Sequence, residues 1–385
     1  MKITYSSPKA FLAILILLAL GCHQPQHKNH SILTKRAYTQ LPNWDQSHHE
    51  KSLQTFQKSC QVMLKKHPEK SIGFAKFHMQ AKDWFLVCRQ ALKLGSHLGN
   101  QQAKDFFEHY FTPYQWTEKS QGLLTGYYSP EIKGQLKQSA SYRYPIYATP
   151  DDLVIVKLAD FSPNYVQKFI YGKILGKHLI PYDTRAQISK GSIKNRAPVL
   201  AWVKNPMDAL DLEIQGAGVI LTPAKKIILN YAAQNGHPYQ AIGKFLIEEH
   251  KINRADMSMY TIREYFHQHP NEIDYYFNKN PSYVFFKIVE KPLFFGAQNI
   301  PLTSGYSLAI DQRFVPLGMP IFLSTELPTH RMFNRLMIAQ DIGGAIKGPV
   351  RGDIYWGGGA YAKKMASLMK QQGNYWMLIP NNKSS

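Results

Sequence analysis

The spacing of apolar residues predicts a helical segment followed by a longer part built from short strands. Between about residues 46 and 110 the apolar positions recur with a helical period. One apolar face holds Leu53, Phe56, Cys60, Met63 and Leu64, and another holds Trp84, Phe85, Cys88 and Leu92. We therefore predict amphipathic helices that serve as a scaffold in this segment.

Two of the three cysteines, Cys60 and Cys88, lie on these apolar faces. In an oxidising compartment they could form a disulfide that pins two antiparallel helices together. Two buried free thiols are equally consistent with the pattern, because a free cysteine packs as a small apolar residue. Both interpretations stay open at this stage.

From residue 122 onward, short apolar or aromatic runs are interrupted by glycine and proline, which is typical of strands. Examples are the runs 144–147, 197–202 and 212–215, whereas residues 227–267 have a helical pattern. The C-terminal part again contains short strands, at 283–289, 306–310, 320–323, 336–340 and 375–379. One helix interrupts them, with Ala362, Met365, Ala366 and Met369 on its inner face and Gly373 as its C-cap. Many short strands with one helix favour a small closed β-barrel.

The first 21 residues have the pattern of an export signal. Lys2 and Lys9 give a positive start, and residues 11–20 form an apolar core that is too short to span a bilayer. The core ends near Cys22, which could receive a thioether-linked lipid and become the mature N-terminus. An ordinary secretory signal followed by a chance cysteine is the alternative. Because His23 rather than an acidic residue follows Cys22, we predict a lipid-anchored protein of the outer membrane that faces the periplasm.

The net charge of the chain is +20, or +18 without the two lysines of the signal. Such a charge suits an anionic partner: a nucleic acid, a membrane surface or an acidic polymer. The export signal argues against nucleic acid and favours an anionic cell-wall environment. Residues 22–45 are polar and rich in His and Gln, and we predict that they form a tether.

Familiar metal and cofactor signatures are missing: there is no His-Glu-x-x-His, no cysteine pair at metal spacing and no phosphate-loop sequence. We therefore expect neither a metal nor a cofactor. Three aspartates stand out because each lies at the end of a predicted strand: Asp311, Asp341 and Asp353. Taken singly, an aspartate beside glycine more often forms a turn or cap. In one small barrel the three could converge on one mouth, where crowded carboxylates raise at least one pKa.

Several motifs, spread in order along the chain, resemble one known family. They are 124–128, 213–218, 235–239 with 242–243, 280–286, 310–311 with 315–318, 341–348 and 351–357. With these motifs the chain resembles the membrane-bound lytic murein transglycosylase A family over nearly all of its mature length.

The resemblance implies a mainly β fold with an α-helical N-terminal part. A double-psi β-barrel domain would carry a second, inserted β-barrel domain, with a groove for a sugar polymer between them. The divisions of this chain would be a signal at 1–21, the tether at 22–45, helices and the first part of the barrel at 46–131, the insert at 132–235, and helices with the three-aspartate barrel segment at 236–385.

The resemblance also implies roles for individual residues. It assigns the catalytic acid to Asp353, with Asp341 and Asp311 as supports. We expect substrate contacts from Thr125, Gly126, Tyr127, Tyr128, Gln215, Gly216, Gly343, Gly344, Lys347 and Trp356. The tyrosines could instead belong to the barrel core, and Lys347 could be a solvated surface amine. For His237 we predict a cap or core role.

The implied activity is cleavage of peptidoglycan glycan strands between N-acetylmuramic acid and N-acetylglucosamine without water, in cell wall turnover. Protonated Asp353 would donate to the glycosidic oxygen and then accept the proton of the muramyl C6 hydroxyl as it attacks C1, leaving a 1,6-anhydro end. The alternatives are a hydrolytic muramidase and a non-catalytic peptidoglycan-binding lipoprotein. Expected partners are the glycan strands, the membrane through the N-terminal lipid, and complexes with cell-wall synthases. Nucleic acid is not expected.

Overall fold

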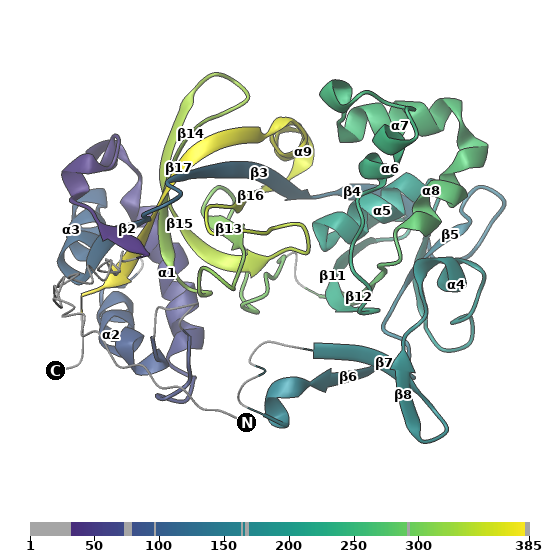
Figure 1. The fold of residues 1–385 in the computed structure, drawn as a ribbon, viewed down its shortest axis with the longest axis horizontal. Helices are drawn as coiled ribbons and strands as arrows, with labels where there is room; N and C mark the ends of the chain where they lie inside the picture. Colours follow the sequence, from purple (N-terminus) through teal and green to yellow (C-terminus); the bar gives the residue numbers. More distant parts are fainter. Residues whose placement is uncertain are drawn as a thin grey trace, which may run out of the picture. The chain divides into compact units, whose positions relative to one another are not determined.

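The computed structural model describes residues 32–72, 79–95, 98–162, 165, 169–290 and 293–381 (Figure 1). The predicted signal at 1–21 and the predicted lipidation site Cys22 lie outside the described residues. Within the described ranges, no helix is both long enough and apolar enough to cross a membrane.

The N-terminal segment forms the predicted helical scaffold. Its helices are α1 (His49–Met63), α2 (Phe85–Lys93) and α3 (Asn100–Tyr110), with the short 3₁₀ helix η3 (Ala81–Trp84) before α2. The apolar face of α1 is buried in one large core cluster that also includes strands of the C-terminal barrel. The period of this segment was therefore sufficient to predict its helices and the buried face of α1.

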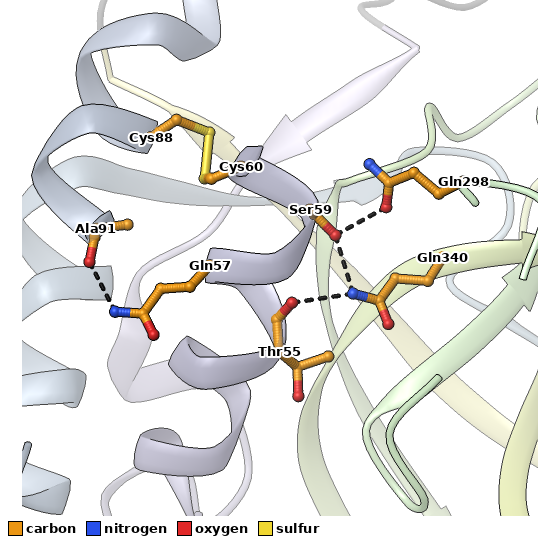
Figure 2. Close-up of a disulfide and its surroundings, with 8 residues drawn as sticks. All are labelled: Thr55, Gln57, Ser59, Cys60, Cys88, Ala91, Gln298 and Gln340. Carbon is orange, nitrogen blue, oxygen red and sulfur yellow. Dashed lines mark hydrogen bonds between the residues drawn. A yellow bond between two sulfur atoms is a disulfide. The ribbon is translucent and has the colours of Figure 1, made fainter. Parts of the chain in front are cut away.

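A disulfide joins Cys60 on α1 to Cys88 on α2 (Figure 2). The sequence left open a disulfide or two buried free thiols, and the structure contains the disulfide. The bridge links residues 28 positions apart and so closes a loop of moderate length in the unfolded chain.

Replacing both Cys60 and Cys88 with Ser is expected to lower the free energy of unfolding by about 3 kcal/mol, because the unfolded chain loses its cross-link. Urea unfolding of the oxidised protein and of the double variant measures this difference. Wild-type protein unfolded in a reductant should match the variant. Equal stability of the oxidised wild type and the variant would contradict the prediction.

The part of the predicted tether that the structure describes, residues 32–45, is folded rather than extended. Strand β1 (Leu33–Lys35) pairs antiparallel with β2 (Phe111–Trp116), and two short 3₁₀ helices follow, η1 (Tyr38–Gln40) and η2 (Trp44–Gln46). The prediction is wrong here because three apolar side chains among the polar ones, Leu33, Leu41 and Trp44, are buried in the core.

A closed six-stranded β-barrel holds the three aspartates. Around the barrel the strands are β17 (Lys370–Pro380), β14 (Pro320–Glu326), β15 (Met332–Ile342), β13 (Ser307–Ile310), β16 (Gly352–Gly358) and β3 (Gln121–Ser129), and β3 pairs with β17 again. The pairs β13–β15 and β16–β3 are parallel, and the others are antiparallel. Strand β3 enters from a distant part of the sequence, as predicted for a barrel that is interrupted by an insert.

Helix α9 (Gly359–Leu368) packs against β3 and β16 and buries Ala362 and Met365. It ends before Gly373, which we had predicted to be its C-cap. Gly373 instead lies in β17 opposite Gly122, where an added Cβ atom would come 2.6 Å from a methyl group of Leu124. The close approach of β17 and β3 that closes the barrel thus accounts for this glycine.

The inserted domain is built on a second six-stranded sheet with its own small core. Its strands are, in spatial order, β12 (Val284–Val289), β11 (Lys226–Gln234), β10 (Ala217–Leu221), β4 (Glu131–Gln135), β9 (Val199–Val203) and β5 (Tyr144–Tyr147). A bridge between Ala148 and Phe286 brings the two edges together. The predicted range 132–235 is therefore too short, because β12 lies beyond it. A separate three-stranded sheet contains β6 (Val154–Lys157), β7 (Phe169–Leu175) and β8 (His178–Pro181).

Five helices accompany the second sheet in the described part of this region: α4 (Arg185–Ser189), α5 (Pro206–Gln215), α6 (Ile242–Glu248), α7 (Met259–Gln268) and α8 (Ile273–Lys279). Two local predictions are wrong. Residues 212–215 belong to α5, which begins with an Asn205 cap and Pro206 and ends at Gly216 in the left-handed region. Residues 227–234 form β11 instead of a helix. Both runs are too short for their apolar period to separate helix from strand.

Candidate active site

The strand register places two of the aspartates on either side of one small residue. Ala309 on β13 is paired with Asp341 on β15 and with Asp353 on β16. On the other side of β16, Asp353 is paired with Thr125 on β3, and Thr125 is paired with Lys370 on β17. Five adjacent strands of the closed barrel thus bring these residues to one level of its wall.

Asp341 is held in place by three hydrogen bonds. The Tyr127 hydroxyl donates to Oδ2 at 2.8 Å, and the backbone N–H groups of Ala297 and Ile342 donate to Oδ1, each at 2.9 Å. All three groups donate, so the carboxyl group has little freedom to rotate and its orientation is fixed by the barrel wall.

Asp353 has a different environment. The Thr125 hydroxyl donates to Oδ1 at 2.6 Å. Among the described residues no group bonds to Oδ2, and the side chain is half-buried, so this oxygen is free to carry a proton and to reach a ligand.

The surroundings raise the pKa of both carboxyl groups. Burial raises the pKa of Asp341 to about 6, against the hydrogen bonds from Tyr127, Ala297 and Ile342, and the charge of Asp353 adds to the increase. Burial also raises the pKa of Asp353, although the Thr125 hydrogen bond and the charge of Arg351 oppose it. Two interacting carboxyl groups titrate as a pair, so together they retain a proton at a pH where isolated aspartates would be ionised.

Asp311 does not join this pair through any contact in the described structure. Its buried carboxylate pairs with the side chain of Arg313, and the Gly348 N–H donates to its Oδ2 at 2.8 Å. Burial alone would raise the pKa of Asp311, but these hydrogen bonds outweigh it and lower the pKa. Asp311 thus fixes the end of the 343–348 loop as a charged group, and its supporting role in catalysis stays a prediction.

The other residues predicted as substrate contacts separate into two groups. Thr125 and Tyr127 bond to the carboxyl pair, and Gly343, Gly344 and Lys347 lie on the half-exposed to exposed loop after Asp341. The second group makes contacts within the protein: Tyr128, Gln215, Gly216, Gly126 and Trp356.

Tyr128 and Trp356 are buried in the large core cluster that includes the barrel strands, so their contact with substrate stays a prediction. The Tyr128 N–H donates to Oε1 of Gln215, so these two residues tie β3 to α5, which Gly216 terminates. Gly126 allows the Trp356 ring to approach, because an added Cβ atom would be 2.5 Å from the indole nitrogen. His237 Nε2 donates to the Tyr182 carbonyl at 2.7 Å, in keeping with its predicted structural role.

A buried polar network that the sequence analysis missed connects α1 to the strand residue before Asp341 (Figure 2). Gln340 Nε2 donates to the Thr55 carbonyl and to Ser59 Oγ, each at 2.9 Å. Ser59 in turn donates to Gln298, whose own N–H bonds to the Gln340 carbonyl next to the Ala297–Asp341 contact. The sequence signal that could have revealed this network is Gln340, a polar residue that ends the otherwise apolar run 336–340.

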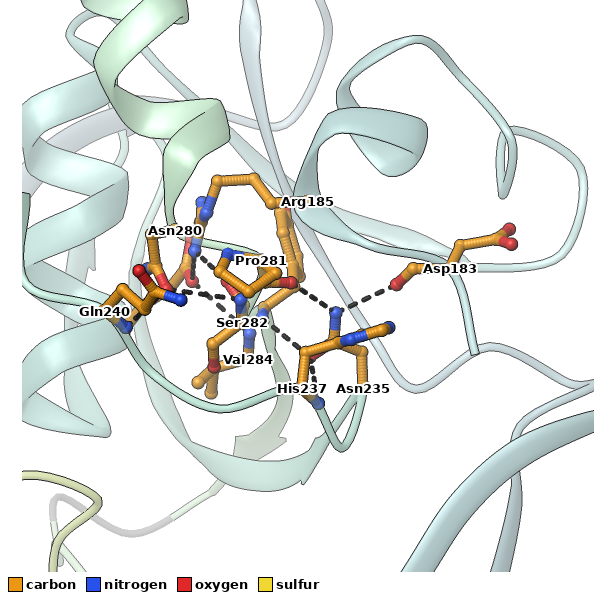
Figure 3. A network of polar contacts seen from close by, with 11 residues as sticks. Asp183, Arg185, Asn235, His237, Gln240, Asn280, Pro281, Ser282 and Val284 are labelled. Atoms are coloured by element: carbon orange, nitrogen blue, oxygen red, sulfur yellow. Dashed lines mark hydrogen bonds and ion pairs between the residues drawn. The ribbon is translucent and has the colours of Figure 1, made fainter. Parts of the chain in front are cut away.

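A second missed feature is the buried ion pair between Arg185 of α4 and Glu213 of α5. Both guanidinium Nη atoms donate to the Glu213 carboxylate. Nη2 also donates to the Ser282 carbonyl at 2.6 Å, and Figure 3 shows Arg185 and Ser282 side by side. Asn235 joins the surrounding loops by donating to the carbonyls of Asp183 and Pro281. Sequence spacing carries no sign of this pair, whose members are 28 residues apart.

A cavity of about 770 Å³ is lined in part by Thr125, whose hydroxyl bonds to Asp353. Thr125 and Lys370 contribute its barrel side, and residues of α5, α6, α7 and the segments that precede α6 and α7 contribute the rest. In the part of the chain that the structure describes, no group of three or more His, Cys, Asp or Glu side chains is arranged to hold a metal ion.

Together these features define a class of protein: a double-psi β-barrel that presents a carboxyl pair in its wall and carries an inserted β-domain. A family model described as the MltA specific insert domain matches residues 123–287, and one described as the 3D domain matches residues 306–379. The second range contains all three aspartates, and the first runs from β3 of the barrel into the last strand of the inserted sheet.

Individual proteins agree with these matches. The chain is 32% identical over 266 residues to the membrane-bound lytic murein transglycosylase A of Escherichia coli K12, covering 66% of this chain and 65% of that relative, slightly less than two thirds of its length. A crystal structure of MltA from Neisseria gonorrhoeae is 34% identical, with a TM-score of 0.75 and coverage of 91% of this chain and 93% of that one. A crystal structure of E. coli MltA with bound chitohexaose is 26% identical, with a TM-score of 0.59 and coverage of 78% and 83%. This chain belongs to the membrane-bound lytic murein transglycosylase A family.

Proposed function

We propose that this protein is a lytic transglycosylase that cleaves peptidoglycan glycan strands between N-acetylmuramic acid and N-acetylglucosamine, and that it acts in cell wall turnover. Family membership supports this proposal, as does the chitohexaose bound by the E. coli relative, which is a β-1,4-linked amino-sugar chain. The observation that carries it is the half-buried Asp353 carboxyl, with one oxygen held by Thr125 and the other free.

Asp353 acts first as the acid. Its proton passes to the glycosidic oxygen, the bond between that oxygen and C1 of the muramyl ring breaks, and positive charge develops at C1. Asp341, fixed by its three hydrogen bonds, lies two strands away and stabilises that charge when ionised.

Asp353 then acts as the base. It accepts the proton of the muramyl C6 hydroxyl while that oxygen bonds to C1, which closes the 1,6-anhydro ring and restores the protonated acid. No water is consumed, because the internal hydroxyl has a high effective concentration. Asp311 fixes the end of the loop that holds Gly343, Gly344 and Lys347. This loop contacts the glycan strand beside the carboxyl pair.

Product analysis tests this function against the hydrolytic alternative. Purified peptidoglycan is digested with protein that lacks residues 1–22, and the fragments are separated and weighed. The proposal expects muramyl ends without a reducing aldehyde and lighter by one water than hydrolysis products. Reducing ends would identify a muramidase instead, and intact strands that remain bound would identify a non-catalytic binding protein.

The rate of cleavage is expected to fall as the pH rises through the raised pKa of the carboxyl pair, because Asp353 must hold a proton to act as the acid and burial raises its pKa. Replacing Asp341 with Asn removes the negative neighbour of Asp353, lowers the pKa of Asp353, and moves this falling limb to lower pH by on the order of one unit. Initial rates across a pH series measure the shift.

Tyr127→Phe provides a control of opposite sign. It removes a hydrogen bond that favours the ionised form of Asp341, so the falling limb should move to higher pH. Shifts of both variants in the same direction would contradict the proposed coupling of the pair.

We also propose that Cys22 carries a lipid that anchors the protein in the outer membrane, facing the periplasm, where it meets cell-wall synthases. The export pattern supports this, and relatives are named as membrane-bound. Metabolic labelling with a fatty acid and membrane fractionation of wild type and Cys22→Ser test the anchor. Equal labelling of the two proteins would exclude it.

A further inference from the structure

The separate sheet of β6, β7 and β8 has one face that is entirely apolar (Figure 1). Side chains alternate between the two faces of a strand, and residues that pair across strands share a face. The register of the three strands therefore assigns one set of side chains to a single face: Val154, Val156, Ile170, Ile174, Leu179 and Pro181. This apolar face contains no side chain that can form a hydrogen bond.

The opposite face of the sheet is turned toward the rest of the inserted domain. Tyr171 lies against Gly236, where an added Cβ atom would be 2.5 Å from the Cβ atom of Tyr171, and Lys173 pairs with Asp183. The apolar face therefore points away from the domain, and Ile174 on it is 60% exposed. Single exposed apolar residues are ordinary, whereas a continuous apolar face marks a surface that binds something.

The surroundings of the apolar face are cationic. Residues 154–181 contain four lysines and one aspartate, in a chain with a net charge of +20. Lys157 at the end of β6 and Lys177 in the turn between β7 and β8 are both exposed. A lysine at the border of an apolar surface can lay its methylene groups along that surface and place its ammonium group among anionic headgroups. The charge therefore favours an anionic phospholipid surface as the occupant.

The composition of the face also favours a bilayer over a protein partner. The centre of a protein interface usually combines aromatic and arginine side chains with hydrogen bonds, whereas the acyl chains of lipids contain no hydrogen-bonding group. The sequence places the membrane within reach, because Ile32, the first described residue, follows Cys22 by ten residues. Ten extended residues span at most about 35 Å, so a lipid at Cys22 keeps the fold close to the bilayer.

We propose that the apolar face of β6, β7 and β8 binds an anionic phospholipid surface. Its side chains enter the boundary between headgroups and acyl chains, while the edges of β6 and β8 stay among hydrated headgroups, because unpaired backbone groups are costly in hydrocarbon. The face adds a second membrane contact to the proposed lipid anchor and so orients the anchored protein. The inference does not depend on the proposed cleavage reaction.

Flotation with phospholipid vesicles tests this proposal on protein that lacks residues 1–22 and so carries no lipid. Wild type should bind vesicles of phosphatidylethanolamine and phosphatidylglycerol, and should bind less when phosphatidylcholine replaces phosphatidylglycerol. The double variant Ile170→Thr/Ile174→Thr keeps β-branched side chains in β7. It should lower the partition coefficient at least about tenfold, because two aliphatic side chains no longer bury fully among the lipids.

Two further variants separate the face and the charge. Ile155→Thr is the matched control, because Ile155 is 46% exposed but lies on the opposite face of the sheet, and it should bind as wild type does. Lys177→Gln should lower binding to the anionic vesicles about fivefold and leave binding to the neutral vesicles unchanged. Since Lys177 lies in an exposed turn, this variant keeps the test valid if the double variant does not fold.

A wild-type protein that does not bind the anionic vesicles would overturn the proposal. Equal losses in Ile155→Thr and the double variant would overturn it too, because the two faces would then be equivalent. Sedimentation without vesicles examines the other occupant: a dimer that the double variant dissociates, together with no vesicle binding, would identify the face as a contact between copies of the chain. Vesicle binding requires no cleavage, so failure of the proposed activity leaves this inference standing.

Discussion

Asp353→Asn is expected to lower the rate of glycan cleavage by at least about 10³-fold while leaving strand binding nearly unchanged. An amide has the shape of the carboxyl group but cannot deliver a proton to the glycosidic oxygen or take one from the C6 hydroxyl, and general acid–base catalysis contributes roughly 10²–10⁴-fold in each role. The Thr125 hydroxyl can still donate to the amide oxygen, so the barrel wall is preserved. Release of soluble fragments measures the rate, and pelleting with insoluble peptidoglycan measures binding.

The matched control is Asp105→Asn, which changes an aspartate on α3 that bonds only to Gln101 in the described structure. It should cleave at the wild-type rate. Turnover of Asp353→Asn near the wild-type rate would remove Asp353 from the acid role and direct attention to Asp341, the other carboxyl group of the pair. Loss of binding in Asp353→Asn would instead indicate a damaged fold.

Arg185→Met is expected to lower the free energy of unfolding by about 3–5 kcal/mol, the largest stability effect that the structure predicts. The substitution leaves the carboxylate of Glu213 buried without its counter-charge, and the Ser282 carbonyl loses its donor. Urea unfolding, followed by the fluorescence of the aromatic residues, measures the change.

The double variant Arg185→Met/Glu213→Leu separates the ion pair from its surroundings. With both charges removed, no uncompensated charge remains, and the loss should shrink to on the order of 1–2 kcal/mol, attributable to the unpaired Ser282 carbonyl and Val284 N–H. If the single and double variants are equally unstable, the coupling between the two charges is not what stabilises the junction of α4 and α5.

The predictions that succeeded rest on patterns that are local in the sequence. The apolar faces of residues 46–110 formed helices, and α1 buries Leu53, Phe56, Cys60 and Met63 as expected, because a long amphipathic period has one stable solution. On α2 the buried residues are Val87, Cys88 and Ala91, whereas the predicted Phe85 and Leu92 are half-buried. The strands around Asp311, Asp341 and Asp353 also form the predicted barrel. These strands are bounded by glycines and prolines, which restrict where a strand can end.

The predictions that failed concern runs whose partners are distant. Residues 212–215 and 227–234 are too short to reveal a period, and their helix and strand identities depend on caps and on pairing with β10 and β12. Leu33 and Trp44 are isolated in a polar segment, and they are buried only because the barrel and α3 provide a surface for them.

By itself, the sequence predicted the helical scaffold, the class of barrel and the three aspartates as candidate catalytic residues. Only the tertiary structure decided how the aspartates divide. Strand register places Asp341 and Asp353 on either side of Ala309, and burial raises the pKa of both. Arg313 and Gly348 instead donate hydrogen bonds to Asp311 and lower its pKa. The physical reason is that a pKa depends on burial and on neighbouring charges, and both are set by closure of the barrel rather than by residue type.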